Sequence, residues 1–508
     1  MNAKHKACMN RRFITLAAAL CIALPVLSQN YQRTVNRNLW NDGSNITGIR
    51  QDTASIAFAE LSGTYTSGVF RDYSDPVTGW TAGASSAAVR HLEKFSLAGG
   101  FSFVQTQGKD MCGSMFIEPG KYPVDIFEFT PGTKSRQSYA FDGGISVDLS
   151  DNWRAGAVME FESQNYSKRK DLRYVSYALD MSVRPALMYH NGDFAVGLNY
   201  VFRKSSEAPQ AEQIGTTVAS YDAFIDKGLY YGVNQIWTGS GVHLNEAGVS
   251  GFPVRELTNG IALQASWKEL YADFEYDIRS GEAGEKQFIW YRFPGYEMKG
   301  RISWKHDSGF GTHYLRLSAG YMNQDNNETV LEKVTEGGVT TVTDHGYNRL
   351  YSRAIANAAL RYEIVAPMWS ARIAAGTEMA QYLSSAMYPF KVFRKEALPF
   401  VSVGGEFRPG RFELRLDASA HKGSVSETDS MVSDASGVVG NPFRMEAVMR
   451  HMDEYRNAMC TDICLALRYC LEMGLYVEAD AGWTHAFGLE IIDGSDRTVA
   501  GIRIGYEF

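Results

Sequence analysis

The sequence predicts an all-β protein, a transmembrane antiparallel up-and-down β-barrel of about 18 strands, with 14 or 16 as alternatives. Three observations predict it. Apolar and polar residues alternate along most of the chain, as in strands with one apolar face. These runs mostly reach about ten residues, enough to cross a bilayer at a tilt. Short turns alternate with long polar connections, which is typical of outer-membrane barrels and not of soluble sandwiches.

The N-terminal residues 1–28 have the pattern of a secretory signal peptide. Four Lys and Arg residues precede an apolar run at 13–27, and Ser28–Gln29 offers a cleavage point. A membrane anchor is the alternative, although the run is short for a span. Cleavage would remove four cations and no acid, changing the formal charge from −7 to −11. We therefore expect an exported, mildly acidic chain that does not bind nucleic acid.

The composition supports strands as the membrane-crossing elements. The mean hydropathy is −0.25, which leaves no room for a large helical membrane region. After removal of the signal peptide, Cys112, Cys460, Cys464 and Cys470 remain, too few for a disulfide scaffold. Two interpretations stay open for them: a bridge between Cys112 and Cys460, or small buried side chains.

The predicted barrel spans residues 54–508. Residues 29–53 are expected to form a periplasmic N-terminal segment or hatch, because about 25 residues are far fewer than a plug domain needs. The alternating runs begin near residues 54–66, 79–91 and 95–107, continue through 139–149, 153–161, 175–183, 194–202, 270–278 and 412–418, and end with 458–471, 474–485 and 497–508.

The connections fall into two length classes. Short ones lie at residues 92–94, 150–152, 190–193, 306–309, 365–367 and 408–410, and long polar ones near 108–134, 207–257, 324–347 and 423–457. Trp153, Trp267, Trp304 and Trp369 flank predicted short turns, where the aromatic girdle of the periplasmic interface would lie. The short turns are therefore expected at the periplasmic end.

The chain ends with a strand pattern in which Ile502, Ile504, Tyr506 and Phe508 share one face. A last strand has to pair with the first, since an unpaired edge is not tolerated in lipid. This end resembles the assembly signal of Gram-negative outer-membrane barrel proteins, and the loop pattern extends the resemblance over residues 54–508. The resemblance implies the outer membrane as the location, with lipid, lipopolysaccharide and the barrel-assembly machinery as partners.

The resemblance is to an uncharacterised barrel family, which carries no activity with it. The stretch "NLWNDGSNITG" at residues 38–48 is similar to the N-terminal hatch of long-chain fatty-acid channels. That short similarity names no substrate.

The polar faces of the strands supply the candidate site. If the apolar faces meet lipid, twelve charged residues point into the lumen, because Arg on the lipid face would cost about 2–4 kcal/mol at midplane. They are Arg154, Glu160, Asp273, Glu275, Arg361, Arg372, Glu413, Arg415, Arg468, Glu478, Asp480 and Arg503. Arg468 and Glu478 are expected to face each other across the last periplasmic hairpin. The charges either set the selectivity of a hydrated channel or satisfy a closed interior.

Two long connections contain unusual patterns. Tyr230, Tyr231 and Trp237 make residues 207–257 too apolar for a freely solvated loop, so this loop folds inward as a constriction, packs as a lid, or packs on itself outside. Residues 441–460 predict a helix with a Met stripe and His451. A Met stripe favours packing over a Cu(I) site, and we expect no metal and no cofactor.

Enzyme signatures are absent from the sequence. Asp417, His421 and Ser424 form a rim trio that leaves a hydrolase as the weakest alternative, and the protein is expected not to be an enzyme. The favoured hypothesis is a porin-like channel for small solutes, or the channel subunit of an uptake complex with a partner. The alternative is a sealed barrel that acts as a surface binding or structural protein through its long loops.

Overall fold

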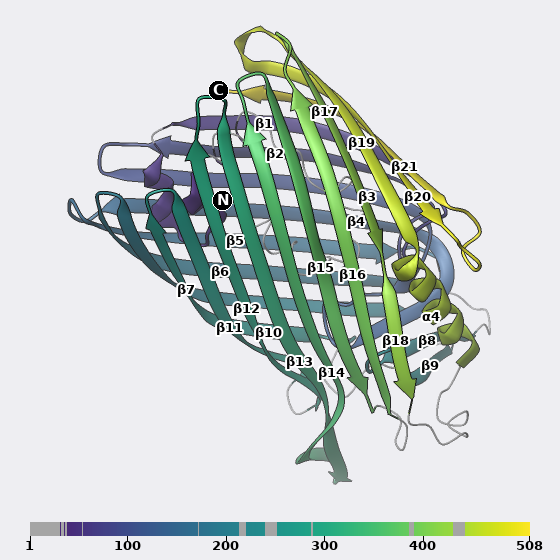
Figure 1. The fold of residues 1–508 in the computed structure, drawn as a ribbon. Coiled ribbons are helices and arrows are strands. Elements are labelled where there is room, and N and C mark those ends of the chain that lie inside the picture. The colour runs from purple at the N-terminus through teal and green to yellow at the C-terminus, as the bar shows by residue number, and fades with distance from the viewer. Residues whose placement is uncertain are drawn as a thin grey trace.

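The computed structural model describes residues 31, 35, 38–52, 54–170, 172–212, 220–238, 251–285, 288–385, 391–429 and 442–508. It is a closed antiparallel barrel, drawn in Figure 1. The first half of the wall comprises β1 (Ile56–Gly68), β2 (Thr78–His91), β3 (Phe95–Ser114), β4 (Asp125–Asp148), β5 (Trp153–Lys168), β6 (Arg173–Asn191), β7 (Phe194–Glu212), β10 (Val254–Trp267) and β11 (Leu270–Glu285). The second half comprises β12 (Phe288–Asp307), β13 (Thr312–Glu336), β14 (Val339–Val365), β15 (Trp369–Ser384), β16 (Val392–Phe407), β17 (Phe412–Lys422), β18 (Ser424–Asp429), β19 (Met459–Cys470), β20 (Leu475–Phe487) and β21 (Asp496–Glu507).

The wall contains 18 strands, as predicted. Both β17 and β18 pair with β16, so they are two halves of one wall strand, interrupted at Gly423. The hairpin of β8 (Ser220–Asp226) and β9 (Gly232–Thr238) stands apart from the wall and pairs with the start of β4. The helical elements are η1 (Leu39–Asp42), η2 (Ile46–Gln51), η4 (Glu472–Gly474) and α4 (Pro442–Asn457).

The last strand closes the barrel against the first. β21 pairs with β1 over eleven residues of each strand, from Phe58–Glu507 to Gly68–Arg497. The backbones of Ala57 and Phe508 then exchange two hydrogen bonds of 2.7 and 2.9 Å. The side chains of Ile502, Ile504, Tyr506 and Phe508 are exposed on the outer surface, where a bilayer would cover them.

The outer surface of the barrel is apolar and the inner surface is polar. Large exposed side chains such as Leu263, Ile373 and Leu465 alternate along their strands with inward polar residues. Trp153 and Trp267 are exposed beside short turns, as expected for an interfacial girdle. A closed 18-strand barrel with this outer surface belongs in the outer membrane. Among the described residues, no helix is long and apolar enough to span a membrane.

The prediction of a long connection at residues 324–347 is wrong. β13 and β14 continue through these residues and are joined by Gly337 and Gly338 alone. Both glycines have positive φ, which suits a two-residue hairpin turn. The Val and Thr residues that are frequent from Val330 to Val342 favour the extended conformation here. The hairpin protrudes from the end of the barrel where α4, β8 and β9 lie (Figure 1).

The four cysteines of the predicted barrel are free thiols. Cys112, Cys460 and Cys464 are buried and Cys470 is half-buried. The interpretation as small buried side chains is therefore confirmed for the first three, and the Cys112–Cys460 bridge is absent.

Candidate functional site

The inner segment, residues 38–52, lies inside the short-turn end of the barrel. Asn38 and Asn45 cap its two 3₁₀ turns, because their side chains accept hydrogen bonds from the amides of Trp40 and Thr47 at 3.0 Å. Trp40 is buried against the ring of Tyr271 and donates its indole N–H to Ser266 at 3.0 Å. The segment is therefore packed on the inner wall at β10 and β11.

Polar contacts hold the inner segment to strands on several sides of the lumen. Asp42 accepts hydrogen bonds from Arg316 on β13 at 2.8 Å and from Ser303 on β12 at 3.3 Å. Arg50 forms an ion pair of 2.5 Å with Asp148 on β4. The side chains of Asn45 and Gln264 on β10 are joined by a hydrogen bond of 3.0 Å. The segment thus spans the opening from β4 to β13.

Glycines in the wall make a recess for this segment. An added Cβ at Gly197 would lie 2.5 Å from Asn45 Nδ2. One at Gly156 would lie 2.7 Å from Ile46 Cγ2, and one at Gly144 would lie 2.8 Å from Ile46 Cδ1. Real Cβ atoms do not approach so closely, so a larger residue at these positions would displace the side chains of Asn45 and Ile46.

All twelve charged residues predicted for the lumen lie on inward-facing strand positions and have polar partners. On β5 to β12, Arg154 pairs with Asp148 at 2.9 Å, Glu160 with Ser182 at 2.9 Å, and Glu275 with Lys299 at 2.9 Å, and Asp273 accepts the amide of Ser44 at 3.2 Å. On β14 to β17, Arg361 pairs with Glu363 at 2.7 Å, Arg372 with Asp417, and Arg415 with Asp417 at 3.6 Å. On β17 to β21, Arg468 pairs with Glu478 at 2.8 Å and Glu413 at 3.8 Å, and Arg503 pairs with Glu478 at 2.6 Å and Asp480 at 2.9 Å.

The predicted Arg468–Glu478 contact is part of a buried network beside the closing seam. The two side chains are 2% and 1% exposed. Arg468 also lies over the ring of Tyr476, at 3.9 Å from its centroid, and Tyr476 donates its hydroxyl to Glu60 on β1 at 2.6 Å. The network therefore ties β19 and β20 to the first strand.

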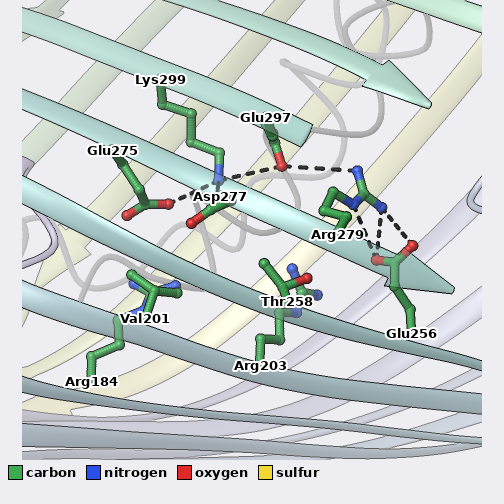
Figure 2. Close-up of a pocket in the computed structure, with 10 residues that line it drawn as sticks. All are labelled: Arg184, Val201, Arg203, Glu256, Thr258, Glu275, Asp277, Arg279, Glu297 and Lys299. Atoms are coloured by element: carbon green, nitrogen blue, oxygen red, sulfur yellow. Dashed lines mark hydrogen bonds and ion pairs between the residues drawn. The ribbon is translucent and has the colours of Figure 1, made fainter. Parts of the chain in front are cut away.

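A further charge cluster lies on β6, β7 and β10 to β12 (Figure 2). Most of its residues were missed in the sequence. The ammonium group of Lys299 lies 2.9 Å from Glu275, 3.0 Å from Asp277 and 3.5 Å from Glu297. Arg279 pairs with Glu256 at 2.7 Å. The cavity between these side chains has a volume of about 30 Å³, room for one or two waters. The alternation that found Asp273 and Glu275 also predicts Asp277 and Arg279.

Two connections fold into the opposite, long-loop end of the barrel. Residues 115–124, between β3 and β4, reach the far wall, where Arg353 on β14 donates to the carbonyls of Gly120 and Lys121 at 2.8 and 2.9 Å. The turn after β8 also reaches that wall, since Lys227 forms an ion pair of 2.5 Å with Glu328 on β13. Both connections therefore cross the lumen.

The hairpin in residues 207–257 lies within this closure. Tyr230 and Tyr231 are half-buried. The rings of Tyr230 and Phe127 pack edge to face, with their centroids 6.0 Å apart. The side chain of Trp237 lies outside the described part of the chain. Burial raises the pKa of Asp226, at the end of β8, to about 7, although the amide of Gly228 donates to its carboxyl group.

The Met-rich helix packs on the same hairpin. Met445, Val448 and Met452 of α4 are buried against Phe127 and Phe224. Met459 is not in the helix but on β19, exposed on the outer surface. His451 contacts the carbonyl of Arg71 at 2.8 Å through its Nε2. Asn441, the first residue of the predicted helix, lies outside the described residues.

The rim trio is not brought together by any described contact. Asp417 pairs with Arg372 and Arg415. His421 lies 3.9 Å from Asp462 instead, and Ser424 begins β18. The residues therefore have structural partners other than one another.

A cavity of about 350 Å³ lies inside the barrel, against the inward-folded connections after β3 and β8. Its walls come from opposite sides of the barrel, β3 to β5 on one side and β13 to β15 on the other, with residues 72–76 and α4 completing them. Seven tyrosines of the described part of the chain line it: Tyr73, Tyr122, Tyr166, Tyr230, Tyr351, Tyr382 and Tyr455. This volume is in the range of small-molecule sites, roughly 300–1,000 Å³. No sequence pattern predicted it, because its residues come together only when the loops fold inward.

The sequence profile of one family matches residues 47–508, the whole of the barrel. The chain belongs to DUF6850, a family of unknown function. This agrees with the expected uncharacterised barrel family. The similarity to the hatch of fatty-acid channels stays a prediction. No curated protein sequence matches the chain.

Solved structures with a similar architecture include BauA, the ferric preacinetobactin receptor from Acinetobacter baumannii. It is 8% identical, over 89% of this chain and 80% of that chain, with a TM-score of 0.41. The FrpB iron transporter from Neisseria meningitidis is 10% identical, over 89% and 81% of the two chains, with a TM-score of 0.41. Likenesses this distant carry no argument about what the present protein binds or moves.

Proposed function

We propose that this protein is a gated outer-membrane channel for small polar solutes, and that the described conformation is its closed state. The observation that supports the proposal is the position of the inner segment, which lies across the short-turn end in a glycine recess. Release of this segment would open the lumen to the periplasm.

The contacts of the inner segment suit a part that leaves and returns. Most of them are hydrogen bonds and ion pairs, such as Asp42–Arg316 and Arg50–Asp148, which water replaces when the segment moves away. The net stabilisation from each is about 0.5–3 kcal/mol, with charged groups at the upper end. Its apolar contacts form two clusters, one around Ile46 and Ile49 and the other around Trp40.

A permanently open porin fits this geometry less well than a gated channel. Inward elements occupy both ends of the lumen: residues 38–52 at one end, and residues 115–124 with the β8–β9 hairpin at the other. Opening therefore needs a trigger, and we propose a solute at the outer end or a periplasmic partner of an uptake complex. Insertion would depend on the assembly machinery, lipid and lipopolysaccharide. The proposal assigns no reaction to the protein.

A second candidate function is a sealed barrel that binds partners through its outer loops. The observation that favours it is the Arg468–Glu478 pair, which is buried and surrounded by further ion pairs. A closed interior satisfies its charges in this way.

Single-channel recording in a planar bilayer separates the two functions. The full chain is compared with a variant that lacks residues 38–52, and heat-modifiable migration on a gel checks that both are folded. The proposal predicts rare openings for the full chain and more frequent openings for the deletion, in which the closure by residues 115–124 and the β8–β9 hairpin remains. A control variant with residues 330–347 shortened, in the protruding hairpin, should behave like the full chain. A folded deletion variant without conductance would overturn the gated channel and favour the sealed barrel.

A further inference from the structure

We propose that the cavity below the inward loops is the solute-binding chamber of the channel, and that its solute is a neutral carbohydrate. The proposal rests on the proposed function, since it names the class of solute that the gated lumen admits. It stands on the geometry and the aromatic lining of the cavity, and on the pairing of its charged residues within the protein.

The cavity occupies a position where a solute entering from outside would be held before release. The loop residues 115–124 and the turn at 227–230 cover it, and inward residues such as Arg279 and Met322 contribute to its lining. The inner segment closes the opposite end of the lumen. A solute in this chamber would therefore lie between two closures.

The aromatic lining offers flat apolar surfaces. The rings of Tyr351 and Tyr382 are stacked at an interplanar angle of 8°, with centroids 6.2 Å apart. Tyr230 lines the cavity from the β8–β9 hairpin. Tyrosine combines a ring face with a phenol hydroxyl group, which donates and accepts hydrogen bonds. A sugar ring presents the matching surfaces, C–H groups on its faces and hydroxyl groups around its edge.

The lining contains charges of both signs, and they are largely used within the protein. Among the described residues, six cations and five acids line the cavity. Arg353 donates to two loop carbonyls and to Gln324, Lys134 donates to the carbonyl of Cys112 at 2.9 Å, and Arg279 pairs with Glu256. A charged solute would have to displace these contacts and leave a buried group uncompensated, which is costly.

A neutral solute with many hydroxyl groups avoids this cost. Each hydroxyl group donates one hydrogen bond and accepts others, so it can bind next to carboxylates, guanidinium groups and phenols without changing the net charge. The mixture of cations, acids and tyrosines around one cavity therefore fits a polyhydroxylated ligand better than an ion.

Isothermal titration calorimetry on the detergent-solubilised full chain tests the inference. The probes are the neutral disaccharides maltose and cellobiose, the aromatic anion benzoate and the aromatic cation benzamidine. Binding of at least one disaccharide, and weaker or no binding of the two ions, is expected. Tighter binding of either ion, or no binding of any probe, would overturn the inference.

Variants locate the binding site. Tyr382→Leu removes a ring face from the cavity and should weaken disaccharide binding at least fivefold, and Tyr382→Phe, which keeps the ring, should weaken it less. Tyr347→Phe, in the exposed hairpin, is the control and should bind as the full chain does. An equal loss in the control, or undiminished binding by a folded Tyr382→Leu variant, would contradict the assignment of the cavity.

The outcome is distinguishable from a failure of the channel. If the variant without residues 38–52 conducts but the full chain binds no disaccharide, only the assignment of the binding chamber is rejected. If the protein binds a disaccharide but neither the full chain nor the deletion variant conducts, the binding chamber is supported and the proposed transport function is rejected.

Discussion

The ion pair between Asp42 and Arg316 gives the sharpest prediction about the gate. The Nε atom of Arg316 donates to Asp42 at 2.8 Å, and the two side chains are 15% and 13% exposed. Asp42→Asn removes the charge and keeps the shape. A hydrogen bond to a charged group stabilises by about 1.5–3 kcal/mol. We expect the lower value, because Arg316 retains a second ion pair, with Glu363 at 3.6 Å. About 1.4 kcal/mol is a tenfold change in an equilibrium.

Hydrogen exchange measured by mass spectrometry is the assay for this prediction. Peptides that cover residues 38–52 should exchange about tenfold faster in Asp42→Asn, since exchange follows the population of the released segment. Wall peptides should be unchanged. The control is Asp344→Asn, which breaks the exposed Arg292–Asp344 pair of 3.2 Å and should leave the inner segment unaffected, because such surface pairs contribute about 0–1 kcal/mol. Unchanged exchange in residues 38–52 of Asp42→Asn would refute the reasoning.

Three further predictions concern the seam, the closing strand and the outer loops. Arg468→Met should lower the temperature of the heat-modifiable gel shift, because breaking a buried pair costs about 3–5 kcal/mol; an unchanged temperature would mean that Glu478 does not depend on this partner. Deletion of Phe508 should reduce the folded fraction in outer-membrane preparations, and normal assembly would exclude our account of the C-terminus. The raised pKa of Asp226, about 7 against about 3.9 ordinarily, means that the packing of β8 is most stable below about pH 4 and weakens as the pH rises through 7. Trypsin cleavage after Lys227 should therefore rise from pH 5.5 to 8.5 relative to Asp226→Asn, and parallel pH profiles would contradict this.

The wall strands were predictable from the sequence because each depends on local alternation. The closing pair was predictable because an unpaired edge strand is not tolerated in lipid. The Arg468–Glu478 contact was predictable for a related reason, since a short turn fixes which residues face each other across a hairpin. The gate contact was not predictable. Asp42 and Arg316 are 274 positions apart, and only the closed barrel places them together.

The inner segment and the chamber depend on the whole wall. The recess that holds Asn45 and Ile46 is made by Gly144, Gly156 and Gly197, on three different strands, and an isolated glycine in a strand has several explanations. The tyrosines of the chamber come from wall strands, from the connections after β1 and β3, from the β8–β9 hairpin and from α4. Their residue types were visible in the sequence, but their proximity arises from loops that cross the lumen.

A reversible lock on the inner segment tests the central claim most directly. The side-chain oxygens of Ser44 and Asn199 lie 3.2 Å apart, so Ser44→Cys with Asn199→Cys places a cross-link between the segment and β7. In the Asp42→Asn background, single-channel recording should show no openings while the disulfide is formed. Openings should appear in the same membrane after a reductant is added. Openings that are equally frequent before and after reduction would contradict the claim that residues 38–52 are the gate.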